Sequence, residues 1–484
     1  MEAAPSLELP AHQSMEIPSS FLLSSTNSTT LDEALQSLFE ASRTSDGRSH
    51  FASVKLLIPS LLSLISHSLY PAELPLKILR NLCAGEISNQ TSFVAFRGVH
   101  IVMEAFKSQL LDPSLGRFGL QLLGNVALAG EMHQEAVWDG FFPGGFEEIA
   151  RIRESGVADP LCMIIYTCCK GNSRRMGEVC GEQGLKIISE IFTTTTAVGF
   201  KEDLLPLLVE KICFQESNFA SLFLALSSSK NNNILQCPFT TKQAFLLSLL
   251  QKAINQQIDE VHISSDFAVA VLEVLKNASQ VVDCNTRGQS AIPTGSPAID
   301  VLGYSLNILR DICAHEDPTE SSAVSAEGSL REGQVHFVDS LVSSGLLDLL
   351  LHLLRELEPP EILRKSRGQE ENQGKVCPYI GYRSDIVAII GNCTFQRKRV
   401  QDEIRRQNGI LLLMQQCVVD KDNPYLREWG IWAVRNLLEG NMENQREVSE
   451  MELRGPANTP EITGLGLRVE VDPKSQRAKL VNDT

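Results

Sequence analysis

A tryptophan and an asparagine four residues apart, Trp432 and Asn436, are the side chains in this sequence best suited to binding another protein. Residues at i and i+4 project from the same face of an α-helix, so the two would act together. The asparagine amide can hydrogen-bond the backbone of an extended peptide, and the tryptophan can form a slot for its side chains. The pair therefore indicates a surface that recognises peptides.

The asparagine recurs at equivalent positions earlier in the sequence, whereas the tryptophan does not. The residues at the equivalent spacing are Lys77 and Asn81, Gln121 and Asn125, and Ala388 and Asn392. Either the asparagines form a ladder that hydrogen-bonds between repeats, with Trp432 in the core, or they line a binding groove. The sequence favours the ladder. It also disfavours a nuclear-import receptor, whose groove would need several Trp–Asn pairs in a chain with 3 tryptophans.

Asp385 and Arg435 lie in the same C-terminal stretch as Trp432, and we add them to the residues expected to contact a partner. The full set is Asn81, Asn125, Asp385, Asn392, Trp432, Arg435 and Asn436.

Catalytic chemistry has no comparable support. The sequence contains none of the glycine-rich phosphate-binding, zinc-protease or nucleophile-elbow motifs. His133 stands between Glu131 and Glu135, as metal ligands could, but we expect a solvated histidine in a turn. Cys168 and Cys169 have no visible catalytic partner, and no C-x-x-C pair offers a zinc site. We therefore expect no enzyme activity, no cofactor and no metal.

The net charge and the N-terminal sequence indicate which partners and which cellular location to expect. The formal net charge of −16 argues against general binding of nucleic acids or anionic membranes. Short basic clusters, such as residues 397–399, are expected to form a solvated helix face. The cysteines lie mostly in apolar runs, and the N-terminus resembles no signal peptide. The longest apolar stretch, residues 56–69, is too short to span a membrane. A cytoplasmic protein with protein partners is the expectation.

Helices must position these residues. From Leu31 onward, apolar residues recur at i, i+3, i+4 and i+7, which is typical of amphipathic helices. Residues 1–30, rich in serine, threonine and proline, are predicted to be disordered. No convincing alternating strand pattern occurs before residue 450. The exception, residues 465–471, lies in a polar tail that spans residues 450–484.

The helices repeat with a fixed period. Asn81 and Asn125 are 44 residues apart, and so are Asn392 and Asn436. A period of ~40–47 residues is typical of armadillo and HEAT repeats, which must stack because one helix pair cannot bury its apolar face alone. The predicted fold is all-α, an armadillo/HEAT-like α-solenoid wound as a right-handed superhelix.

We predict three regions within the solenoid. They are N-terminal repeats at 31–200, divergent helical repeats at 201–300, and C-terminal repeats at 301–449 with insertions near 314–334 and 358–380.

One segment carries a more specific signal. Residues 422–433 read Asp-Asn-Pro-Tyr-Leu-Arg-Glu-Trp-Gly-Ile-Trp-Ala, with Asn423 and Pro424 placed to begin a helix. With its surroundings, residues 378–449, this segment resembles the C-terminal domain of ataxin-10, an armadillo-repeat family. Gly430 departs from the pattern, since a better helix former is expected there, and the middle third of the chain diverges.

The resemblance implies a non-catalytic cytoplasmic adaptor linked to cell division (cytokinesis), cell survival and development. Self-association through helices left uncovered at a terminus is a further expectation. The alternative is a regulator or chaperone of signalling GTPases of the Gα type, which would wrap a flexible element in a helical-repeat groove. A nucleotide-exchange assay would separate the two, because a passive adaptor leaves the exchange rate unchanged.

Overall fold

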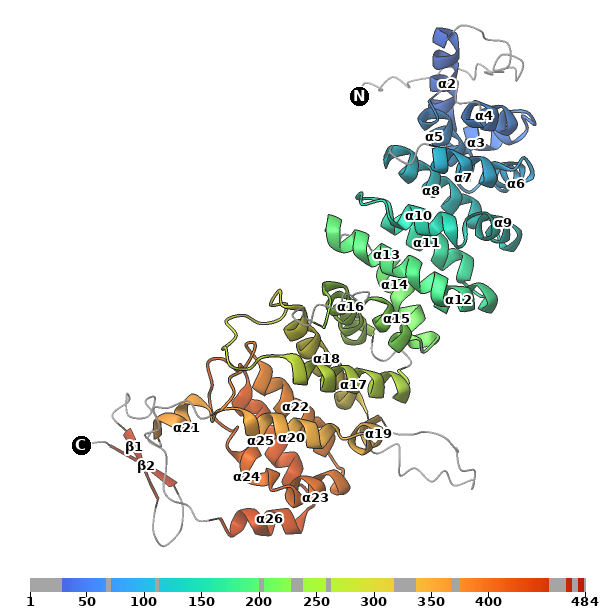
Figure 1. The fold of residues 1–484 in the computed structure, drawn as a ribbon. Helices are drawn as coiled ribbons and strands as arrows, with labels where there is room; N and C mark the ends of the chain where they lie inside the picture. Colours follow the sequence, from blue (N-terminus) through green and yellow to red (C-terminus); the bar gives the residue numbers. More distant parts are fainter. Residues whose placement is uncertain are drawn as a thin grey trace, which may run out of the picture. The chain divides into compact units, whose positions relative to one another are not determined.

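The computed structural model describes most of the chain as α-helices arranged in two compact units, Met1–Leu208 and Val209–Thr484 (Figure 1). The described residues are 28–66, 71–108, 113–199, 204–227, 238–257, 263–316, 337–366, 374–451, 467–471 and 478–482. The predicted disordered segment thus lies outside the described residues up to position 27, while residues 28–30 already belong to the first helix.

The N-terminal unit is a stack of short helices. In order they are α2 (Ser28–Ser42), α3 (Ser45–Ala52), α4 (Leu57–Ser66), α5 (Glu73–Leu82), α6 (Ile87–Ala95), α7 (Gly98–Ser108), α8 (Pro113–Ala127), α9 (Glu131–Phe141), α10 (Gly144–Ala150), α11 (Ala158–Cys169), α12 (Ser173–Cys180) and α13 (Glu182–Val198). α2 packs on α5, α5 on α8 and α8 on α11, and these four follow one another down the stack (Figure 1). We call α5 and α8, which carry Asn81 and Asn125, ladder helices, together with the helices that carry Asp311, Asn392 and Asn436 at the equivalent position.

The C-terminal unit repeats this arrangement. Its helices are α14 (Leu204–Glu210, which crosses the boundary between the units), the π-helical turn η1 (Lys211–Gln215), α15 (Phe219–Ala225), α16 (Thr241–Gln257), α17 (Ser265–Val281), α18 (Pro297–His315), α19 (Phe337–Ser343), α20 (Leu346–Glu356), α21 (Glu361–Ser366), α22 (Tyr382–Thr394), α23 (Lys398–Arg406), α24 (Gly409–Met414), α25 (Leu426–Leu438) and α26 (Met442–Ser449). The ladder helices α18, α22 and α25 pack in sequence, with α16 on the other side of α18.

Leucine spacing explains the individual helices. In α20 the buried residues are Leu346, Leu347, Leu350, Leu351 and Leu354, which form one apolar stripe. α22 is buried on nearly all sides because α18 and α25 both pack against it. Stacked helical repeats in each unit confirm the predicted all-α solenoid class. The right-handed superhelix stays a prediction.

The described parts of the insertion predicted near 358–380 are held in the fold. Leu357 and Lys375 form a parallel bridge, and Val376 N donates to Cys284 O at 2.8 Å. Gly288 N donates to Cys377 O at 2.9 Å. These backbone bonds attach the end of the insertion to the loop after α17. The other insertion falls largely outside the described residues, beyond position 316.

The described part of the tail contains two strands. β1 (Leu467–Val471) pairs with β2 (Ala478–Asn482) in an antiparallel register that sets Val469 opposite Leu480. β1 coincides with the alternating segment noted in the sequence. Among the described helices, none alone is long and apolar enough to cross a membrane. Two bent pairs of helices, α3 with α4 and α19 with α20, would together have the length and apolar composition of a span.

Candidate protein-binding surface

The recurring asparagines hydrogen-bond from one ladder helix to the preceding one. The bonds run from Asn125 Nδ2 to Arg80 O at 2.9 Å, from Asn392 Nδ2 to Arg310 O at 3.1 Å, and from Asn436 Nδ2 to Gly391 O at 3.0 Å. Each acceptor carbonyl belongs to the residue just before the matching position of the preceding helix. Asn81 donates to the Ser42 hydroxyl of α2 at 3.1 Å in the same way. These contacts have the pattern of an interrepeat ladder.

The ladder limits what the asparagines can offer a partner. Asn436 is only 1% exposed, and its amide nitrogen is engaged with Gly391. Asn81, Asn125 and Asn392 are half-buried, and the amide nitrogen of each already donates within the stack. Since a peptide backbone would have to compete with these bonds, the asparagines act mainly as connectors between repeats.

A second ladder closes the ends of these helices. Asn89 Nδ2 on α6 donates to Leu82 O at 2.8 Å, and Asn444 Nδ2 on α26 donates to Leu437 O at 2.8 Å. Each donor lies seven residues after its acceptor, across the turn that follows a ladder helix. A helix leaves its last carbonyls without intrahelical partners, so these side chains satisfy groups that would otherwise be buried unpaired. The dipeptide Asn89-Gln90, which recurs as Asn444-Gln445, therefore has a structural role.

Arg175 holds the same position in α12 with a charged side chain. It is fully buried and donates to Cys168 O at 2.8 Å, again seven residues back. Its other amino group pairs with Glu131 at 2.5 Å and Glu135 at 2.6 Å. The two glutamates that flank His133 in the sequence are thus partners of an arginine. Within the described residues, no group of three or more His, Cys, Asp or Glu side chains could hold a metal ion.

His133 differs from its predicted place in a solvated turn. It lies in α9, is 5% exposed and has Nε2 3.2 Å from Thr91 Oγ1. Burial lowers the pKa of its imidazole. The repeat register explains the difference, because position 133 corresponds to Asn89 of α6, which also faces the stack.

Asp385 is part of the stack as well. Its Oδ1 accepts from Arg310 at 2.8 Å, and its Oδ2 accepts from the Tyr379 hydroxyl at 2.7 Å. Burial raises the pKa of the Asp385 carboxyl, against the opposing effect of Arg310. This acid links α22 to α18 and does not face outward toward a partner.

α25 presents the remaining predicted residues on its outer side. Trp432 is 43% exposed, which corrects the core position that the ladder interpretation assigned to it. The Arg435 guanidinium carbon lies 5.1 Å from the centroid of the Trp432 ring, a cation–π contact. Ile431 and Tyr425 are exposed beside them by 55% and 73%. We call Tyr425, Ile431, Trp432 and Arg435 the α25 stripe.

The start of α25 also differs from prediction. The helix begins at Leu426, and its N-cap is Tyr425 with φ +61°. Asn423 does not cap it, because Asn423 Oδ1 accepts instead from Arg383 N at 2.9 Å. The unexpected Gly430 has a packing reason, since a Cβ there would lie 2.7 Å from Gln416 O. The helix therefore approaches the backbone after α24 more closely than any other residue type permits.

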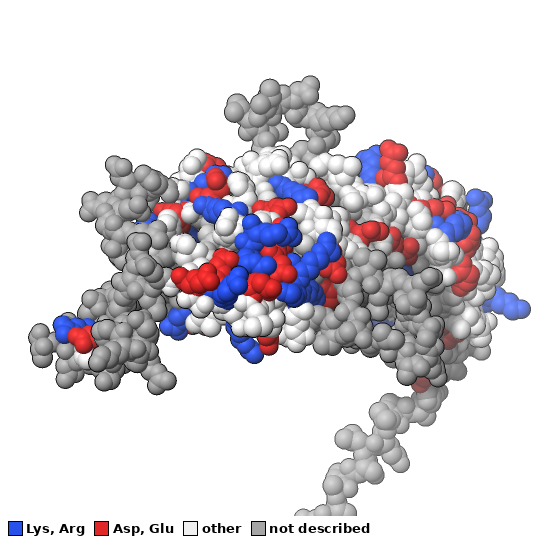
Figure 2. Space-filling view, turned by 90° about the horizontal axis from the view of Figure 1, so that it is seen from below, with Lys and Arg blue, Asp and Glu red and all other residues white. Residues whose placement is uncertain are grey.

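In the basic cluster after α22, Lys398 and Arg399 are exposed as predicted, whereas Arg397 is not. Arg397 pairs with Glu316 at 2.9 Å and is nearly buried, and Lys398 pairs with Glu443 at 3.1 Å. Arg405 donates to Asn444 Oδ1 at 2.6 Å. On the face seen in Figure 2, basic and acidic side chains are interspersed. That face offers no extended positive patch to a polyanion.

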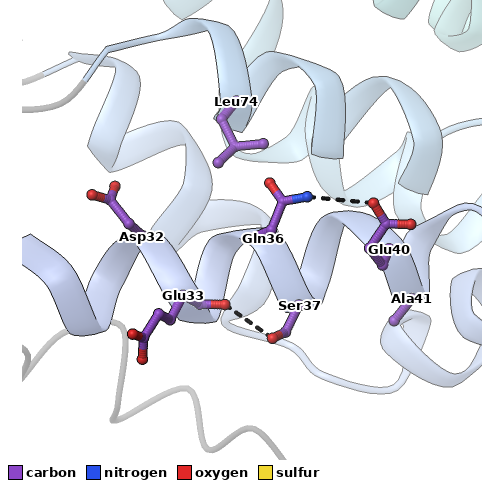
Figure 3. Close-up of a pocket in the computed structure, with 7 residues that line it drawn as sticks. All are labelled: Asp32, Glu33, Gln36, Ser37, Glu40, Ala41 and Leu74. Atoms are coloured by element: carbon purple, nitrogen blue, oxygen red, sulfur yellow. Dashed lines mark hydrogen bonds between the residues drawn. The ribbon is translucent and has the colours of Figure 1, made fainter.

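The first helix lines a shallow recess with acidic walls. Figure 3 shows Leu74 of α5 pointing toward α2, above Asp32 and Gln36. Gln36 donates to Glu40 at 3.3 Å, and Ser37 Oγ donates to the Glu33 carbonyl at 2.9 Å. The recess is open and holds no pair of side chains arranged as a nucleophile and its base, so its chemistry is that of a contact surface.

Comparison with known proteins finds ataxin-10 proteins that align with most of the chain. The family model described as "Spinocerebellar ataxia type 10 protein domain" matches residues 382–481, from α22 to β2. Ataxin-10 of Homo sapiens is 26% identical over 456 residues, which are 90% of this chain and 87% of the relative. Ataxin-10 of Xenopus tropicalis is 23% identical over 422 residues, 84% of this chain and 79% of the relative. The Ataxin-10 homolog of Dictyostelium discoideum is 40% identical over 91 residues, 19% of this chain and 15% of the relative.

The matched domain begins at the helix that carries Asp385 and Asn392 and includes the whole of α25. Residues 382–481 thus carry the domain of the ataxin-10 family, and the chain is similar to ataxin-10 proteins over most of its length.

Proposed function

We propose that this protein is a non-catalytic scaffold that holds partner proteins, and that the α25 stripe is one of its contact surfaces. Membership of the ataxin-10 family supports a protein-interaction role in general, and the family is not a known enzyme family. The finer roles, in cytokinesis, cell survival and development, are proposed from the family resemblance. A cytoplasmic location is proposed as well, supported by described cysteines that form no disulfide bond with one another.

The exposure of Trp432 beside Arg435 carries this proposal. Tryptophan, tyrosine and arginine contribute most often to the binding energy of protein interfaces. On α25 they occur together with Ile431 among the exposed side chains, and the arginine is already held over the tryptophan ring. A side chain held in place loses less conformational entropy on binding. The stripe is thus both apolar and preorganised.

Separate substitutions of Trp432 and Asn436 test the proposal by affinity capture from cell extract with mass spectrometry. We expect Trp432→Ala to keep its melting temperature and lose a subset of partners, because its side chain lies outside the core. Asn436→Ala should melt earlier, because it removes a buried interrepeat bond. Leu411→Ala serves as the matched control, since Leu411 is 53% exposed in the same unit but lies on α24. If Trp432→Ala kept every wild-type partner, the α25 stripe would not be a contact surface.

A further inference from the structure

The ladder helices α5 and α8 expose a cluster of cations around one aromatic ring. Lys77 Nζ lies 4.7 Å from the centroid of the Phe118 ring, and the Arg80 guanidinium carbon lies 5.4 Å from it. Arg117, the residue before Phe118, is exposed. Glu73 pairs with Lys77 at 2.6 Å. We call Lys77, Arg80, Arg117 and Phe118 the α5–α8 face.

Arg80 donates only to neutral oxygens among its described partners. Two of its nitrogens donate to Asn81 Oδ1 at 3.2 and 2.9 Å, and the third donates to Gln121 Oε1 at 3.0 Å. Burial, followed by repulsion from Arg117, lowers the pKa of Arg80. Among the described residues of the unit, no carboxylate therefore balances the positive charge of this half-buried guanidinium.

The equivalent arginine of the C-terminal unit shows what such a site accepts. Arg310 precedes Asp311 as Arg80 precedes Asn81, and it donates to Asp311 Oδ1 at 3.1 Å. It also pairs with Asp385 at 2.8 Å. Asp385 lies seven residues before the ladder asparagine of the next helix, and the residue at that position in the N-terminal unit is Phe118. The carboxylate that completes the site in one unit is replaced by an aromatic ring in the other.

We propose that the α5–α8 face binds an acidic segment of another protein, whose carboxylates pair with Arg80, Arg117 and Lys77 while its apolar side chains pack on the Phe118 ring. This goes beyond the proposed function, because it concerns a different unit and does not rest on the α25 stripe. Charge complementarity identifies the partner class, since Glu73 is the one carboxylate that pairs with these three cations in the described part of the unit. The Phe118 ring, which already contacts two cations, gives the site an apolar surface.

Fluorescence anisotropy with a synthetic probe tests this inference on the full chain. The probe is a short fluorescein-labelled peptide in which glutamate alternates with serine and leucine, and the control peptide has glutamine in place of every glutamate. We expect the glutamate peptide to bind, the glutamine peptide to fail, and added salt to weaken binding by screening the charges. Equal binding of the two peptides would overturn the proposal.

Two variants locate the site. Arg117→Glu reverses an exposed charge, and Phe118→Asp recreates within the chain the carboxylate that Asp385 supplies to Arg310. Each should weaken peptide binding about tenfold or more, which is a loss of about 1.4 kcal/mol. Lys170→Glu, an exposed charge reversal at the end of α11, should leave binding unchanged. Retained binding in both Arg117→Glu and Phe118→Asp, with melting unaltered, would overturn the proposal.

The chain's own N-terminal segment is the competing occupant, since residues 1–27 contain three glutamates and neither lysine nor arginine. A full-length variant with Glu2→Gln, Glu8→Gln and Glu16→Gln separates the two. If the probe binds the wild type and this variant equally, an external acidic partner is supported. If it binds only the variant, the segment occupies the face and the proposal is overturned.

Discussion

Arg80 in the N-terminal unit and Arg310 in the C-terminal unit occupy the same place in the ladder, but their guanidinium groups have different partners. The backbone carbonyl of each accepts from the asparagine of the next ladder helix. The guanidinium of Arg310 meets two carboxylates, whereas that of Arg80 meets two amide oxygens and an aromatic ring. The backbone framework is thus common to the two units, while the charge balance is local to each.

The pKa directions follow this difference. Burial alone would lower the pKa of Arg310, but Asp311 and Asp385 raise it above its ordinary value. The pKa of Arg80 is lowered by burial and by Arg117. A charge balanced inside the stack adds to the cohesion of neighbouring helices. A charge left unbalanced at the surface contributes less to stability and remains available to a partner.

Neutralising each arginine gives the largest expected contrast. Arg310→Gln leaves Asp311 and Asp385 close together and mostly buried, so we expect a loss of about 3 kcal/mol in the free energy of unfolding. Arg80→Gln leaves only neutral oxygens that water can reach, and should cost about 1 kcal/mol. Urea unfolding followed by circular dichroism measures both. Equal losses would show that Arg80 is as deeply integrated as Arg310, and the comparison would fail.

The ladder asparagines should behave alike in the two units, because their bonds are alike. Asn125→Ala and Asn436→Ala each remove one hydrogen bond to a backbone carbonyl, and we expect losses of about 1–2 kcal/mol, the larger one at the fully buried Asn436. Urea midpoints of the two variants and of Ile431→Ala, an exposed apolar control, measure the effect. A negligible loss at Asn436 would mean that the ladder does not join the repeats energetically.

The helical repeats and the asparagine ladder could be predicted from the sequence because both produce regular spacings of residue types. Apolar spacing identifies helices, and the 44-residue interval between asparagines identifies equivalent helices. The role of Arg175 was visible in principle, since it lies seven residues after Cys168 as Asn89 lies seven residues after Leu82. A charged residue at a position held by an amide in α6 and α26 concealed that equivalence.

The exposure of Trp432 could not be predicted, because it depends on whether another helix packs on α25. A tryptophan in an apolar helix has the same local sequence whether it is covered or not. The helix start was missed for a related reason. Asn423 and Pro424 are a good local start signal, but Arg383, 40 residues earlier, engages the Asn423 side chain. Contacts distant in sequence decided both features.

A pH series sharpens the comparison at the position where Asp385 and Phe118 correspond. Burial raises the pKa of Asp385 in the folded chain, so within the interval between its unfolded and folded pKa values the folded state binds more protons than the unfolded state. The contribution of Asp385 to stability is therefore lost as pH rises through that interval.

Measured by urea unfolding, the stability of the wild type relative to Asp385→Asn should increase as pH falls from neutrality through the interval. Other titrating groups are shared by the two proteins and cancel in the difference. Phe118→Leu is the matched control in the N-terminal unit and should show a constant difference from the wild type. A difference between wild type and Asp385→Asn that did not vary with pH would contradict the assignment of a raised pKa.

Arg435 completes the series of arginines and should have the smallest effect on stability. It precedes Asn436 as Arg80 precedes Asn81, but its side chain lies over the exposed ring of Trp432 instead of pairing with a following ladder helix. Arg435→Gln should therefore change the free energy of unfolding by about 0.5 kcal/mol or less, the range of an exposed cation–π contact. Urea unfolding checks this value, and capture of partner proteins by the same variant checks the function. A loss as large as that of Arg310→Gln would place Arg435 in the core of the unit, whereas an unchanged stability with fewer partners would show that the arginine at the end of the ladder serves binding.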